Sequence, residues 1–350
     1  MRKRFFDRFK ILISVFLAVV LMAACDRTVV VTGGFAEGEV FRINTLSCNR
    51  SEMNIYLTNM ANAYEATFGE QIWTTSAGNT TIEDAFKETV LAKVTRIKVL
   101  NLMAKEEKIT LSGDEKKSLK KAAKAYMKTL SKNEKAELGA DEDLVYQMYS
   151  EYALAEKVYN SIVDEVNFEI SDDDARSITV EQIFIKTYHE DTHGRLTDYS
   201  DAAKAEAKER ALAIREKAVT ESDFESLCAL YNEEDESTHT YRRGEMPEAY
   251  ENVAFALEEG EISYVITTED GYYIVKCIST YERKATNENK EAIINEAKRK
   301  AFEEKYNEFL PNVIANINEK EWESIKIIHN AEIKTDSFFD IYTDIMIDGK

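Results

Sequence analysis

Proline, glycine and cysteine are scarce in this chain. Two prolines and 12 glycines among 350 residues are too few for a β-sandwich or for domains joined by flexible linkers. There are four cysteines, and if Cys25 is modified an odd number remains, which argues against a disulfide framework. Cys228 and Cys277 lie in apolar runs, which predicts small core residues.

Positive charge is also in short supply. Lys and Arg number 45 against 65 Asp and Glu, so the net charge is −20. Such an acidic body argues against nucleic acid as a partner, because phosphates would repel it. With 44% hydrophobic and 31% charged residues, the chain can bury a sizeable core, and its length predicts two lobes.

The N-terminus has the pattern of a targeting segment. Five basic residues within the first ten precede the apolar run 11–24, which is shorter than the roughly 20 residues that a membrane span needs. The run ends in Met-Ala-Ala-Cys25, which resembles a bacterial lipobox with Met in the place of the usual Leu. The resemblance implies that Cys25 is lipidated and becomes the new N-terminus. An ordinary signal peptide and a weak membrane anchor are the alternatives, and all three place the body outside the cytoplasm.

Residues 51–170 show the periodicity of amphipathic helices. Thr80 with Glu83 is a capping-box pattern that opens a long helix to about Glu107, and Ser112 with Glu115 opens the next. A third helix carries apolar residues from position 145 to 162, so this region is predicted to be an all-helical lobe.

The pattern changes at Ser177, where a β-branched, alternating run predicts a strand. Two helices are expected next, then a polar, turn-like run to Met246, a short helix, and strands near 262–266 and 272–278. The predicted order β-α-α-α-β-β describes a compact α+β unit. A charged helix over 286–318, kinked or ended by Pro311, and a strand-like tail, WESIKIIHNAEI, complete the chain.

Several motifs between 177 and 280 together resemble a parvulin, a peptidyl-prolyl isomerase domain. They are VEQIFIK in the first strand, DFESLC with Tyr231 in a helix, GEM followed by Tyr250, Phe255 and the GEIS turn, and GYYI in the last strand. In parvulins the first strand and the last strand each carry a histidine. Here Gln182 and Tyr273 stand in those places, the family's glycine-rich loop is missing, and Glu234 falls near the family's Cys or Asp position.

Isomerisation of an X-Pro bond faces a barrier of about 18–20 kcal/mol that arises from amide resonance, and no bond to the substrate need form. An apolar grip on the proline ring and hydrogen bonds to the twisted amide are sufficient. The resemblance assigns the grip to Met246, Tyr250 and Phe255, and the hydrogen bonds to Gln182, Glu234 and Tyr273. The alternative is that Met246 and Phe255 are ordinary core residues.

The order of helices before and after this unit is similar to exported foldases of the PrsA and SurA type. That likeness implies an α+β protein in which a helical chaperone lobe, completed by a returning C-terminal helix, carries an inserted parvulin-like domain. It implies a foldase that is anchored by lipid on Cys25 to the extracytoplasmic face of the cell membrane, that needs no cofactor, and that acts on unfolded or newly exported polypeptides. The alternative function is a holdase of the same fold without useful isomerase activity. The expected segments are a signal peptide at 1–24, a lipidated N-terminus and linker at 25–50, the chaperone lobe at 51–170, the parvulin-like domain at 175–282, and the returning helix and strand at 285–350.

Competing motifs point elsewhere with less support. His189 to His193 satisfies H-E-x-x-H, but zinc proteases need that motif on a helix, and here it follows a strand and precedes Gly194. We therefore expect a solvated loop and no metal site. Acidic runs at 171–174 and 233–235 are explained by helix capping and solvation before calcium binding. A solute-binding lipoprotein would need many βα units, and the sequence lacks that alternation.

Overall fold

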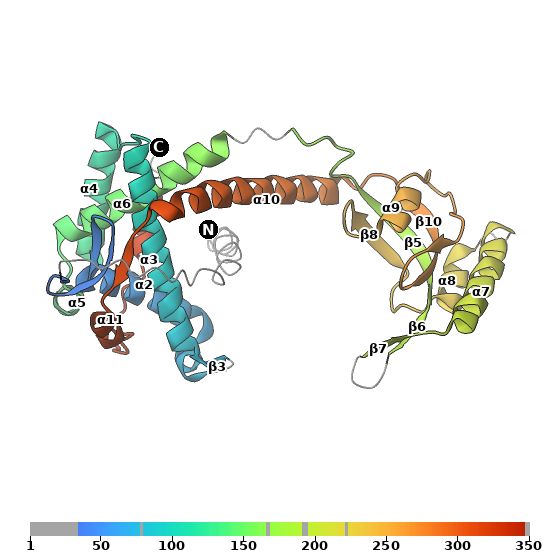
Figure 1. Ribbon diagram of the computed structural model, residues 1–350, viewed down its shortest axis with the longest axis horizontal. Coiled ribbons are helices and arrows are strands. Elements are labelled where there is room, and N and C mark those ends of the chain that lie inside the picture. The colour runs from blue at the N-terminus through green and yellow to red at the C-terminus, as the bar shows by residue number, and fades with distance from the viewer. Residues whose placement is uncertain (1–33, 78–79, 166–168, 191–194, 221–222, 347–350) are drawn as a thin grey trace. The chain divides into compact units, whose positions relative to one another are not determined.

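The computed structural model describes residues 34–77, 80–165, 169–190, 195–220 and 223–346. These residues form two compact units. Unit 1 comprises the described residues within 1–166 and 299–350, and unit 2 those within 167–298, so the division falls inside helix α10 (Arg283–Phe309). Helices dominate unit 1, whereas unit 2 combines an antiparallel sheet with helices, which confirms the predicted α+β class (Figure 1).

Polar side chains cap the helices of unit 1 where the sequence predicts them, with one shift. Ser112 and Glu115 exchange hydrogen bonds in a complete capping box at the start of α4. Thr81, not Thr80, caps α3, so that helix begins one residue later than expected. The helices of unit 1, besides the end of α10, are α2 (Arg50–Phe68), α3 (Ile82–Glu106), α4 (Gly113–Thr129), α5 (Lys132–Leu138), α6 (Glu142–Asp164), α11 (Glu319–Ser324) and α12 (Phe338–Met346).

A small antiparallel sheet joins early and late parts of the chain within unit 1. Its order is β11-β1-β2, and Phe41 in the middle strand pairs with Cys48 on one side and with Ile317 on the other. The sequence analysis did not predict this sheet. The strands are β1 (Glu39–Ile43), β2 (Leu46–Asn49) and β11 (Ala315–Ile317), and the remaining short elements of unit 1 are η1 (Glu70–Thr74), β3 (Ser76–Ala77), β4 (Thr80–Thr81) and η2 (Leu310–Asn312).

The C-terminal region differs from the prediction in two places. The long helix runs from Arg283 to Phe309 rather than from 286 to 318, and of the two predicted effects of Pro311 it is the ending of the helix that the structure shows, because proline lacks the N–H that would continue it. The tail expected as a strand begins instead as α11, whose first turn is capped by the Asn318 side chain, and continues without strand structure.

A buried ionic triad lies among α2, α3 and α6. The Lys98 ammonium is 2.8 Å from Glu52 Oε1 and 2.6 Å from Glu151 Oε2. Lys98 and Glu52 are fully enclosed, and Glu151 is 13% exposed. Burial, with the Glu151 charge beside it, raises the pKa of Glu52 to about 7 against the pull of Lys98. The two carboxylates outweigh the burial of the Lys98 amine and raise its pKa.

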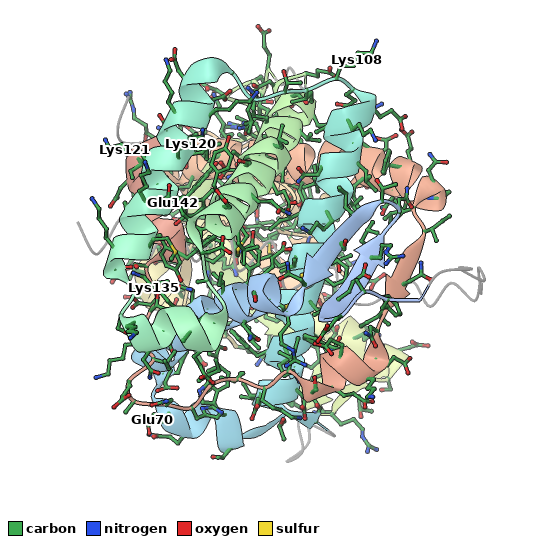
Figure 2. The ribbon with its side chains drawn as sticks, turned by 90° about the vertical axis from the view of Figure 1, so that its left-hand side faces the viewer. Glu70, Lys108, Lys120, Lys121, Lys135 and Glu142 are labelled. Carbon is green, nitrogen blue, oxygen red and sulfur yellow. The ribbon has the colours of Figure 1, made fainter. Side chains whose placement is uncertain are left out.

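Aromatic rings attach the C-terminal helix α12 to the rest of unit 1. Phe338 stacks on Tyr149 with ring centroids 4.4 Å apart, and the Tyr149 hydroxyl donates to the Phe338 carbonyl at 2.7 Å. Charged side chains cover the outside of this unit: Lys108, Lys121 and Glu70 extend from the helical body into solvent (Figure 2).

Unit 2 is built around a four-stranded antiparallel sheet of order β8-β5-β10-β9. The central pair, β5 with β10, is long, with Gln182 opposite Val275 and Phe184 opposite Tyr273, and its register shifts only between Cys277 and Ser279. The strands are β5 (Ser177–Lys186), β8 (Thr238–Arg242), β9 (Ile266–Thr267) and β10 (Gly271–Ser279), with a separate hairpin of β6 (Tyr188–Glu190) and β7 (Leu196–Asp198).

Each face of this sheet has its own core. Helices α7 (Asp201–Thr220) and α8 (Phe224–Tyr231) pack on the face that carries Ile183 and Ile274. Helix α9 (Glu248–Ala254) packs on the opposite face, where the Tyr250 side chain belongs to the second core. Side chains of alternate residues therefore enter different cores, and Gln182 lies on the α9 side.

Strand β10 must begin with glycine, because there is no room for a side chain at position 271. A Cβ atom at this position would lie 2.2 Å from the Ile185 carbonyl oxygen and 2.7 Å from the Phe184 ring. No side chain fits there without separating β10 from β5.

Three predictions for unit 2 need correction. The run before Met246, expected as turn, contains strand β8, so the order includes a strand between α8 and α9. The strand expected over 262–266 is reduced to a bridge at Ile262 and the two residues of β9. The expected loop at His189 is wrong for positions 188–190, which form β6, whereas His193 lies outside the described residues.

The three described cysteines are all buried and free, which confirms Cys228 and Cys277 as core residues. Cys25 and the predicted targeting segment lie outside the described residues. None of the helices in the described part of the chain has the length and hydropathy of a membrane span.

Candidate functional site

Gln182 lies at the centre of a hydrogen-bond network on the α9 side of the unit 2 sheet. Its side chain is completely buried. Its Oε1 accepts from the Tyr250 hydroxyl at 2.6 Å, and its Nε2 donates to Glu234 Oε2 at 2.9 Å and to the Tyr241 hydroxyl oxygen at 3.2 Å. The amide thus uses both of its N–H donors and one of the two lone pairs of its oxygen, as expected of a buried polar group.

Tyr250 and Tyr273 form the apolar floor beneath this network. Tyr250 is fully buried, and its ring meets that of Tyr273 edge to face at 5.1 Å. Tyr273 stacks on Phe184 from the neighbouring strand at 4.3 Å and is 6% exposed. The structure therefore places Gln182 and Tyr273, the residues predicted to stand where parvulins have histidines, on one face of the sheet, joined through Tyr250.

Glu234 reaches the network from the segment between α8 and β8. Its side chain is 31% exposed, so it joins the buried amide of Gln182 to solvent. His239 Nε2 lies 3.9 Å from Glu234 Oε2, and the His239 ring stacks on Tyr241 at 5.3 Å.

Met246 and Phe255 differ in how far they are buried. Met246 is half-buried, lies just before the Pro247 cap of α9, and packs against the cluster that holds Tyr250 and Tyr273. Phe255 is 5% exposed, and its ring faces the guanidinium groups of Arg176 and Arg243 at 5.5 and 4.7 Å. These contacts favour the alternative interpretation of Phe255 as core and leave Met246 accessible.

A hollow of about 540 Å³ opens beside this cluster. It lies where the start of α9 meets the turn between β9 and β10, close to the end of the strand that carries Tyr273. Its lining residues are Pro247, Ala249, Thr267, Thr268, Glu269 and Asp270.

The phenols of this site are hydrogen-bond donors, not bases. Burial raises the pKa of Tyr241 to about 12, and burial followed by neighbouring charges and phenols raises the pKa of Tyr250 and of Tyr273 still further. All three hydroxyls therefore stay protonated near neutral pH. The groups assembled here suit a reaction that changes hydrogen bonding and ring packing without proton transfer or a nucleophile.

Tyr241 and His239 are the site residues that sequence reasoning missed. Both side chains lie on the Gln182 face, because Tyr241 pairs with Ile178 and His239 with Val180 across β5. The signal was the alternation in Thr-His-Thr-Tyr-Arg at 238–242, a five-residue period-2 pattern in a polar stretch.

The zinc-protease motif does not assemble a metal site in the described region. His189 and Glu190 lie on strand β6, where successive side chains point to opposite faces, and the His189 ring contacts Tyr199 at 4.3 Å. Among described residues, no three His, Cys, Asp or Glu side chains gather as metal ligands do.

Comparison with known proteins agrees with this geometry. A family model described as a PPIC-type PPIase domain, of the rotamase group, matches residues 183–279. The foldase protein PrsA of Geobacillus sp. (strain WCH70) is 27% identical over 238 residues, which are 65% of this chain and 79% of that protein. PrsA of Geobacillus kaustophilus (strain HTA426) is 25% identical over 123 residues, 31% of this chain and less than half, 44%, of that protein.

Among solved structures, PrsA from Bacillus cereus covers 85% of this chain and 96% of its own, with 18% identity and a TM-score of 0.35. The family model covers Glu234, Tyr241, Tyr250 and Tyr273, and it begins one residue after Gln182. Residues 183–279 therefore form a parvulin-type rotamase domain of the PPIC class, in a chain similar to the PrsA foldases.

Proposed function

We propose that this protein is an extracytoplasmic foldase whose unit 2 isomerises X-Pro bonds in exported polypeptides. The observation that carries the proposal is the network around Gln182, where Glu234, Tyr241 and Tyr250 converge on the face that also holds Tyr273. Met246 supplies a half-buried apolar contact for a proline ring, and protonated phenols supply donors for a peptide group that has lost its conjugation.

Catalysis here rests on binding alone. The twisted amide has a localised nitrogen lone pair, which accepts a hydrogen bond that the planar amide cannot. Donors held in place before the client arrives stabilise this state without reorganisation. Gln182 is buried, so its role is to position the groups around it, whereas Glu234 and Met246 are exposed enough to meet a client.

A holdase is the second candidate, and the burial of the site favours it. Gln182 is 0% and Tyr273 6% exposed, so two of the three residues assigned to hydrogen bonding are covered. A domain whose polar groups are mainly engaged with each other binds a chain through its rim and accelerates rotation weakly.

Exchange of a proline-containing peptide between its cis and trans forms, followed by NMR with the full chain, separates the two functions. An isomerase raises the exchange rate above that of solvent, and Tyr273→Phe lowers it. The same preparation is assayed for suppression of aggregation of an unfolded test protein. Suppression with an exchange rate equal to that in solvent supports the holdase and defeats the isomerase.

Export and anchoring form a separate part of the proposal. They are supported by the basic segment, the short apolar run and the small residues before Cys25. We expect the mature protein to begin at Cys25 and to carry lipid there. Mass analysis of the N-terminus after expression in a bacterium decides this, since an unmodified Cys25 or cleavage elsewhere would contradict it.

A further inference from the structure

Tyr241 is placed between the buried part of the network and solvent. It lies on β8, at the edge of the sheet, with its side chain half-buried. Its ring meets Tyr250 edge to face at 5.6 Å and stacks on His239. Neither the family motifs nor the sequence pattern assigned this residue a role.

The direction of the hydrogen bonds at Gln182 follows from its neighbours. Glu234 presents a carboxylate, which only accepts, so the amide nitrogen must face it. The opposite amide orientation would turn Oε1 toward the Glu234 carboxylate, two acceptors without a hydrogen between them. With Nε2 on that side, one hydrogen goes to Glu234 and the other to the Tyr241 oxygen, while Oε1 accepts from Tyr250.

Tyr241 therefore accepts a hydrogen bond and keeps its own hydrogen. Within the described residues, no hydrogen bond runs from the Tyr241 hydroxyl to an acceptor. Its pKa of about 12, raised mainly by burial, keeps that hydrogen in place at neutral pH. Accepting from Gln182 also polarises the hydroxyl and makes it a better donor.

The neighbouring phenols are less suited to meet a client. The Tyr250 hydroxyl is fully buried, and its hydrogen is used on Gln182. Tyr273 is 6% exposed, less than Tyr241. Tyr241 combines a hydrogen that is not bonded within the described structure, an oriented oxygen and access from solvent.

We propose that Tyr241 is a client-contacting residue of unit 2 whose hydroxyl donates a hydrogen bond to the X-Pro peptide group, with Gln182 as the positioning residue that orients it. This inference rests on the proposed binding of prolyl clients to unit 2. In this proposal Tyr241, rather than Gln182, contacts the peptide group of the client.

The test compares Tyr241→Phe with the wild-type full chain, using a fluorescent peptide with one X-Pro bond and a matched peptide with Ala in place of Pro. Tyr264→Phe is the control, because Tyr264 is 64% exposed and belongs to the same unit. We measure peptide affinity and cis–trans exchange. Loss of one hydrogen bond should lower affinity or exchange acceleration about two- to tenfold for the Pro peptide, and the control should behave as wild type.

Hydrogen exchange of the β5 and β10 amides shows whether unit 2 remains folded in each variant. A measurement on the wild type avoids that question: with ¹³C-labelled tyrosine, the Tyr241 ring resonance should shift when the Pro peptide is added and not when the Ala peptide is added.

The outcomes separate this inference from the proposed function. Catalysis by the wild type that is unchanged in Tyr241→Phe overturns the role of Tyr241 and leaves the isomerase intact. Pro-peptide binding without catalysis, weakened by Tyr241→Phe, defeats the isomerase and supports the Tyr241 contact. The inference is overturned if the Pro peptide does not bind. It is also overturned if the peptide binds but Tyr241→Phe does not change its affinity and the Tyr241 ring resonance does not shift.

Discussion

The two units bury polar groups in opposite ways. Unit 1 encloses a full ionic triad, Lys98 with Glu52 and Glu151, in which the ammonium has no exposed surface. Unit 2 buries a neutral amide, Gln182, and its one anionic partner, Glu234, is 31% exposed. A charged cluster whose cation is fully buried offers little to a ligand and acts mainly on the stability of its own fold. A network that is centred on a neutral amide and ends in partly exposed groups can exchange its outer hydrogen bonds with a bound chain.

Lys98→Met should produce the largest loss of stability, and it tests whether the buried triad holds unit 1 together. Removing the cation leaves two neighbouring carboxyl groups without a counter-charge in a nearly buried site, which we expect to destabilise unit 1 by about 3–5 kcal/mol. Both tryptophans, Trp73 and Trp322, belong to unit 1, so their fluorescence during denaturation reports this unit. Hydrogen exchange in β5 and β10 should be unchanged. A loss below about 1 kcal/mol would mean that the triad is not essential to unit 1.

The pH dependence of unit 1 follows from the same triad. The pKa of Glu52 is about 7 in the folded protein, above its ordinary value of 4.5, because burial disfavours its charge. Its contribution to stability is therefore fully present below pH 4.5 and is lost as the pH rises through 7. The shift corresponds to on the order of 3 kcal/mol.

Glu52→Gln removes this titration and should flatten the stability of unit 1 between pH 5 and 8. Denaturation followed by tryptophan fluorescence at several pH values checks it, with Glu70→Gln, an exposed glutamate of unit 1, as the control. An equal pH slope in wild type and Glu52→Gln would exclude Glu52 as the responsible group.

Gly271→Ala should destabilise unit 2 and leave unit 1 unchanged, the opposite of the substitutions in the triad. The new Cβ meets the Ile185 carbonyl oxygen and the Phe184 ring, which stacks on Tyr273. We expect a loss of about 1–3 kcal/mol, seen as faster hydrogen exchange in β5 and β10 with unchanged tryptophan fluorescence. Gly113→Ala, where a Cβ meets nothing within 4 Å, is the matched control. Full protection of β5 in Gly271→Ala would show that the strands adjust without cost.

The elements that the sequence predicted well carry strong local signals. The capping box of Ser112 and Glu115 and the long run of β5 depend on residues close together in the chain. Helix α5 was missed although Ser131 and Glu134 form the same kind of box, because seven residues are too short for a clear period. Strand β8 was missed because its alternation covers only five residues and lies in a polar stretch.

The candidate site was predictable only in part. Gln182 and Tyr273 were predicted as site residues from the resemblance to parvulins alone. The prediction did not require knowledge of how strands β5 and β10 pair. The contact of Tyr250 with Gln182 joins residues 68 positions apart, and it depends on how α9 packs on the sheet. No local pattern contains that information. Tyr241 has a role only because Gln182 donates to it, which is a property of the assembled network.

Arg210→Gln should have the smallest effect on stability, because it removes an exposed ion pair of unit 2 instead of a buried charge. Arg210 pairs with Glu233 at 2.7 Å in unit 2, but the two side chains are 50% and 29% exposed. Solvent and salt screen such a pair, and Glu233 keeps its hydrogen bond from the Lys186 backbone after the change. We expect a loss of about 0–1 kcal/mol, smaller still at high salt, by hydrogen exchange in β5. A loss above about 2 kcal/mol would contradict the view that unit 2 depends on neutral contacts, since an exposed pair would then match the weight of the buried triad in unit 1.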